Sequence, residues 1–209
     1  MGIATEAIDR LHTTAESHHR IMILEVMGRH AGWIALYSGM AGGADVVIIP
    51  EKKIKIDDVL NVLKSRYKRG KLFSIIVIAE GATFEDPEVT KSSENIKLDD
   101  FGRARLGGIS HYLAEEIENR TGFETRSTIL GYVQRGGVPS CFDRMLGTRF
   151  GVYSVEMVSD GKFGRMCALQ GNEISDSDIE NKDLGRTSLV NLFPNQNRTD
   201  IDGGYILVA

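Results

Sequence analysis

The feature that most constrains the fold is a regular alternation of short apolar runs with amphipathic stretches. Residues 21–27 are apolar except for Glu25, which is typical of a strand buried on both faces of a sheet. Strands are expected at residues 21–27, 46–49, 74–79, 127–130 and 165–169, and helices at residues 4–15, 33–40, 56–67, 109–119 and 142–158. Repeated strand–helix units predict an α/β fold with a doubly wound, mainly parallel sheet and helices on both faces.

Composition excludes several classes of protein. A chain of 209 residues with 42% hydrophobic residues can bury a packed core. The net charge of −4 argues against a general nucleic-acid or anionic-membrane partner. The two cysteines have no zinc-type spacing, so we expect no metal held by this chain alone. No signal-peptide pattern and no apolar run near the ~20 residues of a membrane span occur, which predicts a soluble, cytoplasmic protein.

Two clusters of glycine and arginine follow apolar runs, at residues 27–32 and 131–137. In open α/β sheets, ligands bind in the crevice beyond the carboxyl ends of the strands. The planar guanidinium of arginine and free backbone N–H groups both suit phosphate oxygens. The two clusters therefore predict a site for a small phosphorylated molecule.

The same clusters belong to an ordered set of motifs at residues 25–32, 42–51, 79–81 and 128–137. In order and approximate spacing, these resemble consecutive motifs of the 6-phosphofructokinases, from about residue 4 to residue 171. The resemblance implies a phosphofructokinase-like fold and a glycolytic phosphotransferase that phosphorylates the 1-hydroxyl of fructose 6-phosphate, from ATP or pyrophosphate. The glycine-rich donor loop and the stretch with the catalytic base are absent. The chain thus resembles the sugar-phosphate side of the site, and Mg²⁺ is expected with the donor, held mainly by residues absent here.

The resemblance also implies roles for individual residues. Arg29 matches the family arginine that faces the transferring phosphoryl group and is the candidate catalytic residue. The substrate-binding candidates are Arg20, Met27, Gly28, Glu80, Arg126, Tyr132 and Arg135. Without the motifs, isolated arginines would be read as solvated, and Glu80 as the partner of a helix-end lysine.

In the resemblance, Arg20, Arg126 and Arg135 match positions that bind the 6-phosphate. The first two reach it from a neighbouring subunit. A homo-oligomer with shared active sites follows. Tyr132 stands where many ATP-using members carry histidine. Pyrophosphate-using and related mixed-type members often carry tyrosine at this position. The donor, ATP or pyrophosphate, therefore stays open.

A second phosphate site is conceivable. Glu51, Arg69 and Lys71 resemble an effector pocket of bacterial members, although His12 replaces its usual arginine. An equally good interpretation is a basic helix C-terminus that interacts with the helix dipole. Asp143 is interpreted as a dipole partner at a helix start rather than as a catalytic base.

We expect residues 1–135 to form the fructose 6-phosphate-binding domain, residues 136–171 a return segment of the donor-binding domain, and residues 172–209 an irregular tail. Two alternatives to an enzyme chain remain. One is a non-catalytic sugar-phosphate-binding or regulatory module, and the other is a structural subunit of a phosphofructokinase oligomer.

Overall fold

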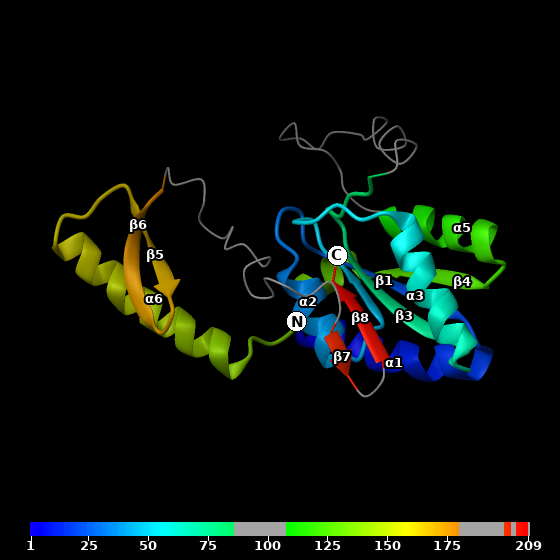
Figure 1. The fold of residues 1–209 in the computed structure, drawn as a ribbon. Coiled ribbons are helices and arrows are strands. Elements are labelled where there is room, and N and C mark those ends of the chain that lie inside the picture. The colour runs from blue at the N-terminus through cyan, green and yellow to red at the C-terminus, as the bar shows by residue number, and fades with distance from the viewer. Residues whose placement is uncertain (86–107, 180–198, 202–203, 209) are drawn as a thin grey trace. The chain divides into compact units, whose positions relative to one another are not determined.

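The computed structural model describes residues 1–85, 108–179, 199–201 and 204–208. The chain divides into two compact units (Figure 1). Unit 1 contains Met1–Arg135 and Ser188–Ala209, and unit 2 contains Gly136–Thr187.

Unit 1 is built on a six-stranded sheet with the order β4-β1-β3-β2-β8-β7. The parallel strands are β1 (Ile21–Val26), β2 (Val46–Ile48), β3 (Ser74–Ala79), β4 (Thr125–Ile129) and β8 (Gly204–Val208). Strand β7 (Thr199–Ile201) runs antiparallel to β8. Every residue of β1 and β3 is buried, as expected for central strands of a parallel sheet.

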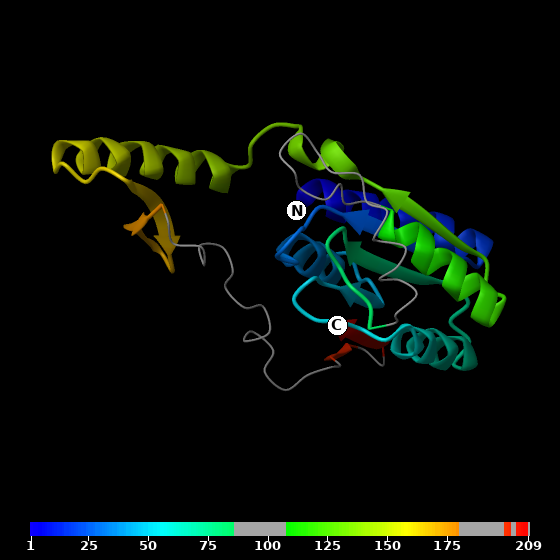
Figure 2. The same ribbon diagram turned by 90° about the horizontal axis from the view of Figure 1, so that it is seen from above.

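Helices cover both faces of this sheet (Figures 1 and 2). Because successive side chains point to opposite faces, Leu24 and Val77 pack on one face with α1 (Gly2–His18) and α2 (Trp33–Ala41). Ile23 and Ile76 pack on the other face with α3 (Ile56–Lys68) and α5 (Ile109–Thr121). The predicted α/β fold, mainly parallel with helices on both faces, is confirmed.

The order of the strands creates a switch point between β1 and β3. After β1 the chain crosses through α2 on one face to β2, which lies beyond β3. After β3 it returns through α5 on the opposite face to β4, which lies beyond β1. The connections of two neighbouring strands thus leave in opposite directions, and the carboxyl ends at such a point are where open α/β sheets bind ligands.

Unit 2 consists of α6 (Cys141–Ser159) packed against a hairpin of β5 (Arg165–Gln170) and β6 (Glu173–Asp178), as Figure 2 shows from above. Helix α6 begins with a capping box, in which the Ser140 side chain accepts from the Asp143 N–H and the Asp143 carboxylate accepts from the Ser140 N–H. Asp143 therefore stabilises the helix start, in agreement with its interpretation from the sequence.

One prediction about local structure is wrong. The segment at 172–209 was expected to be irregular, but β6, β7 and β8 account for most of its described residues. Residues 180–198, 202–203 and 209 of this segment lie outside the described residues. Strand β6 is mostly polar and lacks apolar alternation, but the two-residue turn Gly171-Asn172, with Gly171 at a φ of +62°, joins it to β5. The glycine–arginine cluster at residues 131–137 begins with a 3-10 helix, η1 (Gly131–Arg135). Most of the polar stretch at residues 81–105 lies outside the described residues.

Candidate functional site

The candidate site lies at the carboxyl edge of the sheet in unit 1. Met27, Gly28 and Arg29 follow β1, Glu80 follows β3, and η1 follows β4. Since β4, β1 and β3 are parallel neighbours, these segments leave the same edge side by side. The predicted residues after β1 and β3 meet at the switch point between the two strands.

Backbone contacts hold the segments after β1 and β3 close together. The Glu80 carboxylate accepts a long hydrogen bond from the Gly28 N–H at 3.5 Å, and the Gly81 N–H donates to the Gly28 carbonyl at 3.0 Å. Gly28 has a φ of +153°, and a Cβ on Gly81 would lie 2.0 Å from the Arg29 carbonyl oxygen. Only glycine permits this approach, which places the Glu80 carboxylate beside the Gly28 backbone.

Gln134 of η1 is a contact that the sequence interpretation missed. Its side-chain oxygen accepts from the Met27 N–H at 2.7 Å, one residue beyond the end of β1. The Leu130 N–H donates to the Glu25 carbonyl at 3.1 Å, which is the last backbone hydrogen bond between the β1 and β4 segments. The hydrogen bond from Met27 to Gln134 extends this pairing beyond the ends of the strands. The two glycine–arginine clusters are therefore fastened to each other.

The two other predicted residues of η1 are open to solvent. Tyr132 is 80% exposed, and the Arg135 guanidinium carbon lies 5.3 Å from the centre of its ring. This is a cation–π distance, so the ring holds the guanidinium without using its N–H donors. Both side chains can therefore reach a ligand outside the carboxyl edge.

Glu25 is a second residue that the sequence interpretation missed. The residue is 1% exposed, and its carboxylate accepts from the Gly108 N–H, the Ser110 N–H and, at 2.6 Å, the Ser110 hydroxyl. Gly108 provides no side-chain cap for α5, so Glu25 caps that helix from β1 and interacts favourably with its dipole. A lone acidic residue inside an apolar run was the available signal.

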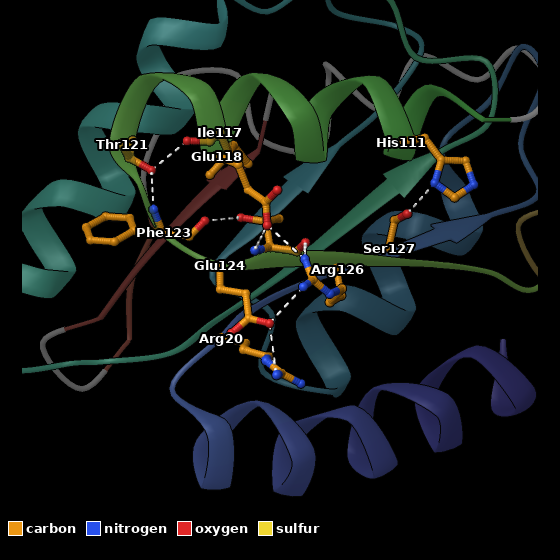
Figure 3. Close-up of polar contacts among 10 residues, drawn as sticks. Arg20, His111, Ile117, Glu118, Thr121, Phe123, Glu124, Arg126 and Ser127 are labelled. Atoms are coloured by element: carbon orange, nitrogen blue, oxygen red, sulfur yellow. Dashed lines mark hydrogen bonds and ion pairs between the residues drawn. The ribbon is translucent and has the colours of Figure 1, made fainter.

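Arg20 and Arg126 lie at the opposite, amino edge of the sheet (Figure 3). Arg20 directly precedes β1, and Arg126 is the second residue of β4. The six residues of β1 separate Arg20 from the carboxyl edge by about 20 Å, at ~3.3 Å per residue. Arg126 lies opposite Met22 and is about 10 Å from the end of β4. One copy of the chain thus brings Arg20 and Arg126 together but keeps them away from Arg135.

The residues of the tentative effector pocket are also separated within one chain. Glu51 follows β2 at the carboxyl edge and accepts from the Gly32 N–H at 2.9 Å, which caps α2. Arg69 and Lys71 lie between the end of α3 and the start of β3, at the amino edge. Such a pocket stays a prediction, and it would need residues from two copies.

The described residues offer no group of three or more His, Cys, Asp or Glu side chains able to hold a metal ion. They also include no helix that combines the length and the apolar character needed to cross a membrane. The arrangement at the carboxyl edge is suited to binding through arginine and glutamate side chains.

Comparisons with known proteins agree with this geometry. A family model described as Phosphofructokinase matches residues 1–158. A pyrophosphate–fructose 6-phosphate 1-phosphotransferase of Streptomyces coelicolor is 55% identical over 83% of this chain and 50% of its own length. An ATP-dependent 6-phosphofructokinase 2 of Clostridium perfringens is 52% identical over 90% of this chain and 51% of its own length.

Solved structures give the same result. The phosphofructokinase of Saccharomyces cerevisiae matches with a TM-score of 0.66 and 31% identity, covering 84% of this chain and 22% of that one. The chain spans about half the length of the curated relatives that it matches.

Proposed function

Because this chain belongs to the phosphofructokinase family, we propose that it takes part in phosphoryl transfer to the 1-hydroxyl of fructose 6-phosphate and supplies the sugar-phosphate side of the site. The observation that carries the proposal is the meeting of Met27, Gly28 and Glu80 at the switch point between β1 and β3. The product would be fructose 1,6-bisphosphate, formed in glycolysis.

Each residue has a defined part in this proposal. The Arg29 guanidinium stabilises negative charge on the phosphoryl group as it moves, which lowers the barrier more than it tightens substrate binding. The Glu80 carboxylate accepts hydrogen bonds from sugar hydroxyls, and the backbone of Met27 and Gly28 contacts the sugar. Arg135 and Tyr132 donate hydrogen bonds to the 6-phosphate.

The site is completed by a second copy of the chain. Arg20 and Arg126 reach the 6-phosphate from the amino edge of that copy, because the amino edge of one chain lies too far from its own carboxyl edge. The protein therefore acts as a homo-oligomer with shared active sites.

Residues 1–135 act as the fructose 6-phosphate-binding domain. The division into compact units after Arg135 supports a boundary there. Residues 136–171 act as a return segment of the donor-binding domain, and the exposed apolar side chains of α6 support this, since a covering domain would bury them.

The donor is ATP or pyrophosphate, and relatives named for each match this chain at similar identity. Mg²⁺ accompanies the donor and neutralises phosphate charge when bound. In this proposal the ion belongs to the donor side of the site, so the parts given above to Arg29, Glu80 and Arg135 do not include holding it.

A second candidate function is a non-catalytic sugar-phosphate-binding module. Such a module would use the same residues at the carboxyl edge, Gly28, Glu80 and Arg135, to bind the sugar phosphate without a catalytic step. A structural subunit of a phosphofructokinase oligomer is the third outcome that an experiment must distinguish.

The test measures fructose 6-phosphate-dependent turnover of ATP, and then of pyrophosphate, with this chain alone and with an amino-terminal complement from the family. Turnover with the complement is the expected result. Binding of fructose 6-phosphate without turnover in either format would indicate the module, and absence of binding would indicate the structural subunit.

A further inference from the structure

The amino edge of the sheet carries a compact charge cluster of Arg20, Arg126, Glu118 and Glu124 (Figure 3). Glu124 Oε1 lies 2.9 Å from Arg20 Nη2 and 2.8 Å from Arg126 Nη2. Glu118 Oε1 lies 2.8 Å from Arg126 Nη1. Two guanidinium groups from different segments thus meet on one carboxylate oxygen.

This is the arrangement that a phosphate oxygen would require. Arginine pairs bind phosphate and carboxylate through the same N–H donors and at similar distances. With both glutamates ionised, the four formal charges of the cluster cancel. An incoming anion therefore meets two correctly placed arginines but no net positive charge.

The backbone of Glu124 is fixed, whereas its side chain is not. The Glu124 carbonyl accepts from the Ile21 N–H at 3.0 Å, where β1 and β4 begin to pair. Its side chain is 41% exposed, so the carboxylate can turn towards solvent. The hydrogen bond from Arg20 lowers the pKa of Glu124 below its ordinary value, so the group is ionised at neutral pH.

Arg20 has an additional donor to offer. Its Nε is buried and, among the described residues, has no hydrogen-bond partner. A tetrahedral phosphate has more acceptor oxygens than a carboxylate and can bind a guanidinium edge as a fork, which here requires the Arg20 side chain to turn so that its buried Nε is exposed. Glu124 therefore uses only part of the donor capacity of this arginine.

We propose that Glu124 is an internal competitor for the anion that Arg20 and Arg126 bind, and that it limits the affinity of the amino edge for the phosphate of the substrate. This inference rests on the proposed function, in which the two arginines reach the 6-phosphate from a neighbouring copy. Phosphate binding then requires the Glu124 carboxylate to leave one or both guanidinium groups.

The test replaces Glu124 with glutamine, which keeps the size and the acceptor oxygen but removes the charge. Glu116→Gln is the matched control, because it removes the same single negative charge from the protein. Glu116 lies on α5 and pairs with Arg120, so this variant leaves both arginines of the cluster paired as before. Glu118→Gln is a graded second variant, because Glu118 pairs only with Arg126 in the cluster.

The first measurement is the rise in Tm of the chain with increasing inorganic phosphate. We expect Glu124→Gln to raise the apparent phosphate affinity about 2- to 5-fold, as for the loss of an exposed ion pair, Glu118→Gln to raise it less, and Glu116→Gln to leave it unchanged. The second measurement is the KM for fructose 6-phosphate with the amino-terminal complement, which should fall in Glu124→Gln with kcat unchanged.

Equal phosphate affinity in all variants would overturn the inference. Weaker phosphate binding by Glu124→Gln would also overturn it, since Glu124 would then order the arginines rather than compete with the ligand. If Glu124→Gln gains phosphate affinity but no form binds fructose 6-phosphate, the competition stands and the proposed function fails.

Discussion

At the residue scale, the amide of Gln134 joins the segment after β4 to the segment after β1. The variant Gln134→Met keeps the length of the side chain but removes the acceptor for the Met27 N–H. One such hydrogen bond contributes about 0.5–1.5 kcal/mol, so affinity for fructose 6-phosphate should fall about 2- to 12-fold.

The same variant has a readout that is independent of activity. Hydrogen exchange of the Met27 amide should be faster in Gln134→Met than in the parent protein, and Gln134→Glu should restore protection because a carboxylate also accepts. Unchanged exchange in Gln134→Met would show that the hydrogen bond does not hold the two segments together in solution.

Arg135 is expected to carry more binding energy than its neighbours in η1. Arg135→Ala should weaken fructose 6-phosphate binding by roughly 1.5–3 kcal/mol, the range for a hydrogen bond to a charged group. Arg10→Ala, which removes an exposed arginine paired with Glu6 on α1, is the control and should leave affinity unchanged. Titration calorimetry measures the affinity of each variant for fructose 6-phosphate. Equal affinity in both variants would remove Arg135 from the site.

At the element scale, a buried ion pair ties α3 to the amino ends of β2 and β3. Arg66 Nη1 lies 2.8 Å from Asp45 Oδ1, and the second Asp45 oxygen accepts from the Ile75 N–H. Burial raises the pKa of Asp45 and lowers that of Arg66, and the opposite charge of each partner counteracts this effect. Each charge is therefore stabilised by the other.

Asp45→Asn should leave the Arg66 charge unpaired and destabilise the protein by about 3 kcal/mol, at the lower end for a buried pair. Glu6→Gln, which breaks an exposed pair, should cost less than about 1 kcal/mol. Urea unfolding measures both changes. A loss for Asp45→Asn no larger than that for Glu6→Gln would contradict the assignment of a stabilising buried pair.

Asp176 gives unit 2 a dependence on pH with a definite sign. The hydrogen bond from the Tyr153 hydroxyl, followed by those from Arg165 and Lys162, lowers the pKa of Asp176 from its ordinary value of 3.8. A carboxyl whose folded-state pKa is lowered contributes stability above its unfolded pKa, and loses it as pH falls through the folded value.

The variant Tyr153→Phe removes the largest cause of this shift. NMR signals of β5 and β6 should then disappear at a higher pH during acid titration than in the parent protein. Tyr37→Phe, on the exposed side of α2, is the control and should not move the midpoint. An identical acid midpoint in all three proteins would mean that Asp176 does not link unit 2 to pH.

Sequence patterns predict the elements whose stability is local or periodic. The apolar run of β1 and the amphipathic spacing of α3 were sufficient to locate both. The β6 strand was missed because its residues are polar and its pairing comes from the hairpin turn. The Met27–Gln134 bond joins residues 107 positions apart, so no local pattern could predict it.

At the scale of the whole molecule, the proposed site makes each copy of the chain depend on another. The carboxyl edge carries Arg135, and the amino edge carries Arg126, with β1 and β4 between them. If the site is shared, Arg126 and Arg135 of one chain belong to two different sites. Replacing Arg126 then damages one site, and replacing Arg135 damages the other. Two inactive variants should therefore complement each other when their chains assemble together.

Co-expression of Arg126→Ala and Arg135→Ala chains, each with the amino-terminal complement, tests this directly. In a mixed pair related by twofold symmetry, one site carries both defects and the other carries neither. Random assembly makes about half the pairs mixed, each with one intact site of two, so roughly a quarter of the parental turnover should return. If both arginines served a site within one chain, every site would retain a defect, and the mixture would be no more active than either variant alone.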